Sequence, residues 1–126
     1  MPEYKEQVFF HHLTEKDQNT SILLENGSIG FEVNWNPTVQ PYFTQWKNTR
    51  QGMYVSGIEP GNCIPEGQNR ARSSGRLQML APGEEVRTSV HLSVLEGADV
   101  IGQAKQEIED LRQSGTPSAG IFSDFS

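Results

Sequence analysis

The chain has 126 residues, a mass of 14.1 kDa and a formal charge of −6, from ten Lys and Arg against sixteen Asp and Glu. This length predicts one domain that builds its own core without stabilising metals or disulfides. Cys63 is the single cysteine, which excludes an intrachain disulfide and a cysteine-based zinc site and favours the reducing cytoplasm. The acidic balance argues against nucleic acid as a partner, and no window approaches the roughly 18 apolar residues that would span a membrane.

The first third of the chain predicts three strands. Gln7 to Leu13 and Thr20 to Glu25 are rich in strand-favouring residues, and we expect them to form a hairpin. A turn at Asn26-Gly27 then leads into an alternating strand that Asn36-Pro37 ends. The apolar face of that strand carries Ile29, Phe31, Val33 and Trp35.

The middle of the chain is less regular. The stretch through Tyr42, Phe43 and Trp46 is aromatic but has no clear period, which predicts an ordered loop; Tyr42, Phe43 and Tyr54 are core candidates. Met53 to Glu59 predicts a strand. It is followed by a long Gly-, Asn- and Arg-containing loop from Asn62 to Gly75, called the arginine loop below.

The last third predicts a short strand at Arg76 to Leu80, a turn at Pro82-Gly83 and a strand at Glu85 to Leu95. Alternation in this last strand predicts an inward face of Val86, Thr88, Val90, Leu92 and Val94. One segment, Asp99 to Gln113, has helical period, with Asp99 as the expected cap.

These elements predict an all-β fold, an antiparallel β-sandwich in residues 1–96, followed by one C-terminal amphipathic helix and a flexible tail in residues 97–126. So short a sandwich leaves sheet edges open. We therefore expect the chain either to close on itself or to form a homodimer, and we favour the homodimer.

From Pro41 to Leu95 the segments QPYFTQWKN, GMYVSGIEPGN and LQMLAPGEEVRTSVHLSVLEG follow in order, with the arginine loop before the last of them. In this order they resemble the C-terminal part of the aldose 1-epimerase (galactose mutarotase-like) superfamily. The resemblance implies that the chain corresponds to the final portion of a larger antiparallel β-supersandwich.

The resemblance places Glu59 on the family's general base, which removes the proton from the anomeric hydroxyl of a sugar. Alternatively, Glu59 accepts backbone hydrogen bonds from its own Pro-Gly turn. The family's acid is a histidine on an upstream segment that this sequence lacks, and neither His11 nor His12 lies in such a motif. The expected function is thus either an epimerase-like enzyme or a non-catalytic carbohydrate-binding remnant of the fold, and a purely structural interaction protein is a third reading.

Five further residues are candidates for contacts with a sugar or sugar phosphate. Trp46 offers a flat ring to a pyranose, or else fills the core beneath the loop. Arg70, Arg72 and Arg76 offer planar donor forks, or else lie in a solvated loop with Arg72 paired to Glu66 or Glu59. Asn62 completes the set, although turn chemistry also explains it. The chain has no phosphate-cradling or metal-binding motif, so we expect neither metal nor cofactor.

Overall fold

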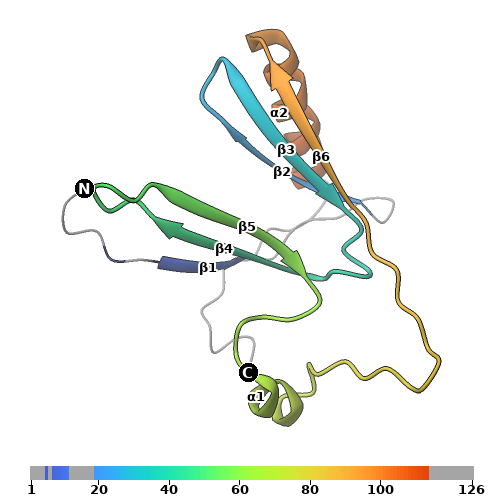
Figure 1. Cartoon of the computed structure of the whole chain (residues 1–126). Helices are drawn as coiled ribbons and strands as arrows, with labels where there is room; N and C mark the ends of the chain where they lie inside the picture. The colour runs from blue at the N-terminus through green and yellow to red at the C-terminus, as the bar shows by residue number, and fades with distance from the viewer. Residues whose placement is uncertain (1–4, 6, 12–18, 114–126) are drawn as a thin grey trace. The chain divides into compact units, whose positions relative to one another are not determined.

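The computed structural model describes residue 5 and residues 7–11 and 19–113 (Figure 1). Contacts divide the chain into two compact units, each built around one three-stranded antiparallel sheet. The first unit holds the sheet β1-β4-β5 and the short helix α1, and the second holds the sheet β2-β3-β6 and the helix α2. The bounds are β1 Gln7–His11, β2 Thr20–Glu25, β3 Ile29–Trp35, β4 Tyr42–Asn48, β5 Val55–Gly61, α1 Gln68–Ser73, β6 Val90–Glu96 and α2 Ala98–Gln113. The division of the chain at residue 96 stays a prediction.

The turn predicted at Asn26-Gly27 is confirmed, and it joins β2 to β3. The Asn26 side chain accepts hydrogen bonds from the backbone N–H groups of Ser28 and Ile29, at 3.0 and 2.9 Å. Gly27 has a φ of 91°, which glycine adopts without steric cost. The end of β3 is also confirmed, because the Asn36 side chain accepts a hydrogen bond from the backbone of Thr38.

The predicted helix is confirmed as α2, which packs on one face of the sheet β2-β3-β6. A Cβ on Gly30 would lie 3.4 Å from Ile101, so the glycine in the central strand lets the helix approach closely. Ile101 and Ala104 are buried in this contact face of the helix. Lys105 also forms an ion pair with Glu25 at 2.8 Å, which joins the helix to the end of β2. Asp99 lies in the first turn of α2, which begins at Ala98.

Two predictions for the first half of the chain are wrong. β1 and β2 do not form a hairpin, because β1 pairs with β4 in the first unit and β2 pairs with β3 in the second. The aromatic stretch is not a loop but β4, the central strand of its sheet. Phe43 is buried as predicted, whereas Tyr54 is 73% exposed and is not a core residue.

The segment before β6 also differs from its prediction. Arg76 to Leu80 forms no strand, and β6 begins at Val90 because its partner strand β3 ends at Trp35, opposite Val90. The side chains of Val90, Leu92 and Val94 are 41–70% exposed, so the prediction that they point inward is wrong. The helix α1 was not predicted; it lies in the expected arginine loop.

Candidate functional site

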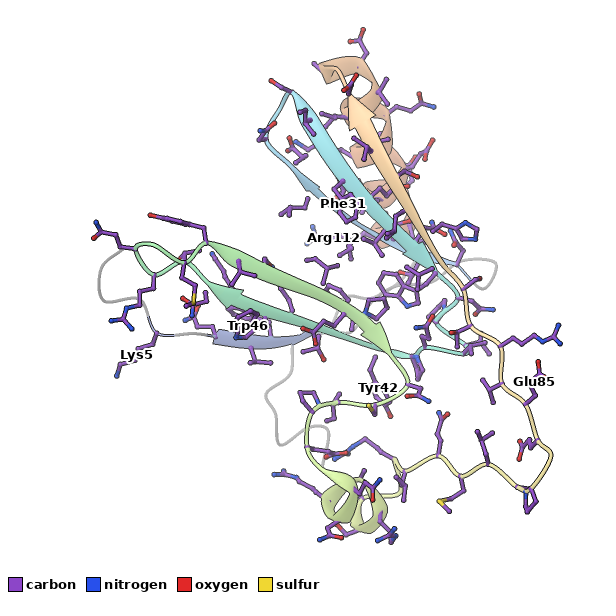
Figure 2. The ribbon with its side chains drawn as sticks, in the orientation of Figure 1. Lys5, Phe31, Tyr42, Trp46, Glu85 and Arg112 are labelled. Atoms are coloured by element: carbon purple, nitrogen blue, oxygen red, sulfur yellow. The ribbon has the colours of Figure 1, made fainter. Side chains whose placement is uncertain are left out.

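The β4–β5 pair brings Glu59 and Trp46 together on one face of the first unit's sheet. In the register of this pair, Thr44 lies opposite Glu59 and Trp46 lies opposite Gly57. Residues two apart on a strand share a face, so Glu59 and Trp46 are diagonal cross-strand neighbours. Trp46 projects from β4 (Figure 2) and is half-buried.

Gly57 makes room for the Glu59 carboxylate. A Cβ placed on Gly57 would overlap that carboxylate and would lie 3.5 Å from the Cβ of Trp46. The carboxylate therefore lies over the glycine, beside the tryptophan. Glu59 is exposed, and no described residue forms a hydrogen bond or an ion pair with its carboxylate. The alternative in which Glu59 is held by its own turn is thus not observed, nor is the pair between Arg72 and Glu59.

Tyr42 lies farther along the same face, at the start of β4 (Figure 2). It pairs with Gly61, one alternate position beyond the pair of Thr44 and Glu59. In the register of the described strands β1, β4 and β5, no histidine occupies a position on this face. His11 occupies the other set of register positions, opposite Phe43, and His12 lies outside the described residues.

A buried ion pair organises the arginine loop. The side chain of Glu66 is 1% exposed, and both its oxygens accept hydrogen bonds from Arg76, from Nε at 2.8 Å and from Nη2 at 2.5 Å. Arg70 lies 3.8 Å from the same carboxylate. The pairing expected between Arg72 and Glu66 is therefore wrong, because Arg76 takes that place. Arg72 is exposed on α1 and has no ion pair within the described residues.

The hydrogen bonds from Arg76 hold the pKa of the Glu66 carboxyl below its ordinary value, and the charges of Arg76 and Arg70 act in the same direction. The same pair raises the pKa of the Arg76 guanidinium, to which Tyr42 adds a smaller electrostatic contribution.

The lowered pKa of Glu66 has a consequence for stability against pH. The pair stabilises the fold above the unfolded-state pKa of about 4.3, and this stabilisation is lost as the pH falls through the folded-state pKa. We expect Glu66→Gln to have a lower melting temperature than wild type at pH 7 and a difference that shrinks steadily in acid. Thermal unfolding of both proteins between pH 3 and pH 7 measures this. A difference that does not depend on pH would contradict the assignment of the stabilisation to the charged pair.

Two cavities border the arginine loop, and Asn62 lines both. One, of about 410 Å³, is lined by Asn62, Cys63, Ile64, Pro65, Gly67, Gln68, Ala71, Arg76, Leu77 and Gln78. The other, of about 370 Å³, is lined by Asn62, Gln78, Met79, Leu80, Glu84 and Val86. Asn62 and Arg76 therefore present polar groups to a largely apolar hollow, as small-molecule sites do. The sequence indicates Asn62 as a candidate, but it does not by itself show that Arg76 pairs with Glu66. The signal that could have predicted this pair is an acidic and a basic residue on either side of a short segment with a glycine at each end.

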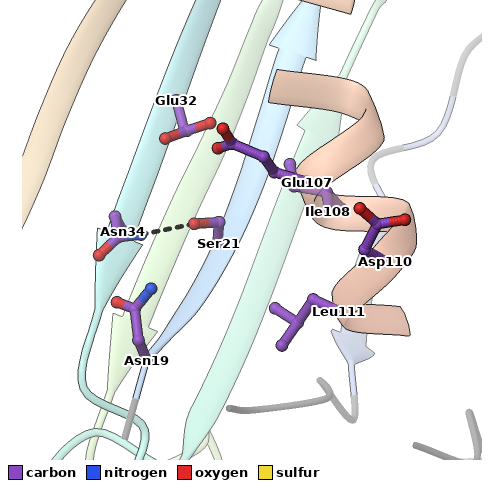
Figure 3. A pocket seen from close by; sticks show the side chains of 8 residues that line it. All are labelled: Asn19, Ser21, Glu32, Asn34, Glu107, Ile108, Asp110 and Leu111. Atoms are coloured by element: carbon purple, nitrogen blue, oxygen red, sulfur yellow. Dashed lines mark hydrogen bonds between the residues drawn. The ribbon is translucent and has the colours of Figure 1, made fainter. Parts of the chain in front are cut away.

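The second unit has a hollow of its own, between α2 and the sheet face that carries Glu32 (Figure 3). Its volume is about 430 Å³, and its lining is Asn19, Ser21, Glu32, Asn34, Glu107, Ile108, Asp110 and Leu111. Asn34 donates a hydrogen bond to Ser21 at 2.6 Å. Partial burial raises the pKa of Glu32, and the negative charge of Glu107 adds to the effect. None of the sequence-predicted site residues lies here.

Within residues 5, 7–11 and 19–113, no group of three or more His, Cys, Asp or Glu side chains is placed to hold a metal ion. In the same residues, no helix is long and apolar enough to cross a membrane.

Comparison with solved structures confirms the predicted fold. The chain is similar to a protein of Klebsiella pneumoniae subsp. pneumoniae that is described, by assignment alone, as an aldose 1-epimerase, with a TM-score of 0.83 and 24% sequence identity. The similarity covers 93% of this chain and 31% of that protein, so the chain spans about a third of its length. The chain thus has the strand arrangement of part of the epimerase-like sandwich, with α2 as its C-terminal helix.

Residues 1–94 match the model of the family described as a domain of unknown function (DUF4432). No curated protein matches the chain. The matched residues include Glu59, Trp46, Asn62, Arg70, Arg72 and Arg76.

Proposed function

The chain belongs to the DUF4432 family, and from this premise and the geometry of the Glu59 face we propose that it binds a sugar and interconverts the sugar's anomers, with Glu59 as the general base. The observation that supports the proposal most directly is the position of the Glu59 carboxylate over Gly57, beside Trp46. An aromatic surface next to a carboxylate suits a pyranose, which has an apolar face and hydroxyl groups at its edge.

The chemistry needs a base and an acid. Glu59 takes the proton of the anomeric hydroxyl while the bond from C1 to the ring oxygen breaks, and the ring oxygen takes a proton in return. The open aldehyde rotates about the bond to C2, and the reverse transfers close the ring with either configuration. Tyr42 carries the phenol of this face, and we propose it as the proton donor.

Asn62, Arg70 and Arg72 are proposed as ligand contacts around this face. Asn62 lines the cavities that begin just after β5, and Arg72 is a cation without an ion pair among the described residues. Arg70 is close to Glu66, which compensates part of its charge. A neutral sugar needs hydrogen bonds from these groups, whereas a sugar phosphate needs the charge of Arg72. We propose the cytoplasm as the compartment because the chain's one thiol, Cys63, is exposed and unpaired.

A second function is favoured by one observation, the absence of a histidine from the described positions of the Glu59 face. Each positioned proton-transfer group contributes roughly 10²–10⁴ in rate, so a site without an effective acid would bind sugar and turn it over slowly or not at all. This second function is the binding of a carbohydrate without catalysis, through Trp46 and the arginine loop.

The experiment that tests the proposal is NMR exchange spectroscopy between the α and β anomers of several free and phosphorylated aldoses. We expect wild-type protein to accelerate the exchange of at least one of them above the rate in buffer. Saturable line broadening without acceleration would support the carbohydrate-binding alternative. If no sugar showed accelerated exchange or line broadening, both functions would be overturned.

Gly57 offers a test of the position of the base. Gly57→Ala should push the Glu59 carboxylate away from Trp46, because the new Cβ would occupy its place. A displacement on the order of 1 Å can cost about 10²-fold in rate. The fold should tolerate the change, since only the far end of a flexible side chain must move. We expect a large loss of anomer exchange with an unchanged or higher melting temperature, and an unchanged exchange rate would contradict the described position of the carboxylate.

A further inference from the structure

Thr44 is a buried polar residue in the middle of the first unit's sheet. It is 4% exposed and lies on β4, the central strand of the order β1-β4-β5. Among the described residues, none forms a hydrogen bond with its hydroxyl. Because most buried hydroxyl groups in folded proteins have a hydrogen-bond partner, and burial without one costs free energy, this exception needs an explanation.

The Glu59 carboxylate is the group that can supply the missing partner. In the register of β4 and β5, Thr44 lies directly opposite Glu59 on the same sheet face. The Cβ atoms of such a pair are about 4.5–5.5 Å apart, so the longer glutamate side chain can bring its carboxylate to the threonine. The next residues of β4 on this face are Trp46 and Tyr42, whose indole only donates and whose phenol is a weaker acceptor than a carboxylate.

The carboxylate itself is available for this contact. No hydrogen bond or ion pair holds it within the part of the chain that the structure describes, and it lies over Gly57, the diagonal neighbour of Thr44 on β5. An unpaired donor and an unpaired acceptor therefore lie opposite each other on one sheet face. Hydrogen bonds of catalytic groups are often long or poorly aligned in the free protein and shorten in the substrate complex. The geometry thus suits a hydrogen bond that forms when a ligand binds.

We propose that Thr44 is a positioning residue of the Glu59 site, an inference that rests on the function proposed above. In the sugar complex, the Thr44 hydroxyl donates a hydrogen bond to one oxygen of the Glu59 carboxylate, and the other oxygen takes the proton of the anomeric hydroxyl. Thr44 keeps its own proton and, being buried, does not contact the sugar. The hydrogen bond restrains a flexible carboxylate in the geometry of proton transfer, on which the rate depends steeply.

Two substitutions at Thr44 separate this role from a structural one. Valine keeps the shape of threonine without the hydroxyl, whereas serine keeps the hydroxyl and loses a buried methyl group. We expect Thr44→Val to lower kcat of anomer exchange by about 10–10²-fold with an unchanged KM, and Thr44→Ser to keep most of the wild-type rate. Thr44→Val should melt at or above the wild-type temperature, because it removes no hydrogen bond of the free protein, and Thr44→Ser should melt below it. The order of the rates is thus the reverse of the order of the stabilities.

Carbon-13 NMR of the glutamate carboxyl groups detects the hydrogen bond without turnover. The Glu59 resonance is identified by its absence from Glu59→Gln. Thr44→Val should leave this resonance nearly unchanged in the free protein and shift it in the complex with a saturating aldose, whereas Thr44→Ser should match wild type in both states. Glu96, an exposed carboxylate of the second unit, is the control, and its resonance should be the same in wild type and in both variants.

Thr44→Val with the wild-type rate and the wild-type resonance in the complex would overturn the inference and leave the proposed function intact. So would a loss of rate that Thr44→Ser shares. A lower melting temperature for Thr44→Val would also overturn it, because the hydroxyl would then be paired in the free protein. Wild-type protein that neither binds nor turns over any aldose would overturn the proposed function, and the inference with it.

Discussion

Glu59→Gln is expected to lower the rate of enzyme-dependent anomer exchange by about 10²–10⁴-fold. Glutamine keeps the shape of the side chain over Gly57 but cannot accept the proton of the anomeric hydroxyl. Sugar binding should change little, because the Trp46 surface beside the carboxylate is kept. The melting temperature should also be nearly unchanged, since Glu59 is exposed and forms no hydrogen bond or ion pair with the described residues. The exchange rate and a sugar titration, measured on the same samples, separate turnover from binding.

Glu96→Gln is the matched control, because Glu96 is also exposed and also lies at the end of an edge strand, in the second unit. It makes the same chemical change and should leave the exchange rate at the wild-type value. Equal losses in the two variants would show that net charge, and not the carboxylate beside Trp46, controls the rate. Full activity of Glu59→Gln would exclude Glu59 as the base.

Trp35→Ala is expected to reduce the free energy of unfolding by about 3–5 kcal/mol. Trp35 is 2% exposed and lies on the central strand of its sheet, between Thr20 on β2 and Val90 on β6. Alanine would leave a cavity that fixed backbone pairing on both sides prevents from closing. Since a domain of this size is stable by only about 5–15 kcal/mol, the loss should be visible as a large shift of the urea midpoint.

Trp46→Ala provides the comparison within the same chain. Trp46 is half-buried on the sheet face of Glu59, so its removal should cost less stability than the removal of Trp35 and should weaken sugar binding more. Urea unfolding followed by far-UV circular dichroism suits both variants because it does not need the tryptophan signal. A loss for Trp35→Ala no larger than that for Trp46→Ala would contradict the assignment of Trp35 to the core.

Elements whose signals are local could be predicted from the sequence. The turn at Asn26-Gly27 depends on one glycine with positive φ and on the Asn26 side chain, so the β2–β3 hairpin followed from four or five adjacent residues. The helix α2 followed from the period of its apolar residues, of which Ile101 and Ala104 are buried.

Strand partners could not be predicted in the same way, because they depend on segments far apart in the chain. β1 precedes β2 directly but pairs with β4, more than thirty residues away. β4 carries aromatic residues in both register sets, Phe43 in one and Tyr42 and Trp46 in the other, so it shows no alternation of apolar and polar residues. The start of β6 depends on where β3 ends, which the sequence of β6 does not contain.

The same distinction between local signals and pairing of distant segments holds for the candidate site. The resemblance indicates Glu59 and the aromatic ring indicates Trp46, but their position on one face needs the register of β4 against β5. The arginine that pairs with Glu66 could not be predicted either, because the loop folds through α1 and carries Arg76, ten residues after Glu66, back to that carboxylate.

The measurement that tests the central claim most directly is a titration of the ¹⁵N-labelled protein with an aldose, followed through its two indole N–H resonances. Trp46 lies beside Glu59, whereas Trp35 is buried in the other unit and serves as an internal reference. We predict a saturable shift of the Trp46 indole together with the Gly57 amide, and no shift of the Trp35 indole. Saturable shifts confined to the hollow beneath α2, or no shift at Trp46 with any aldose, would contradict the assignment of the sugar site to the Glu59 face.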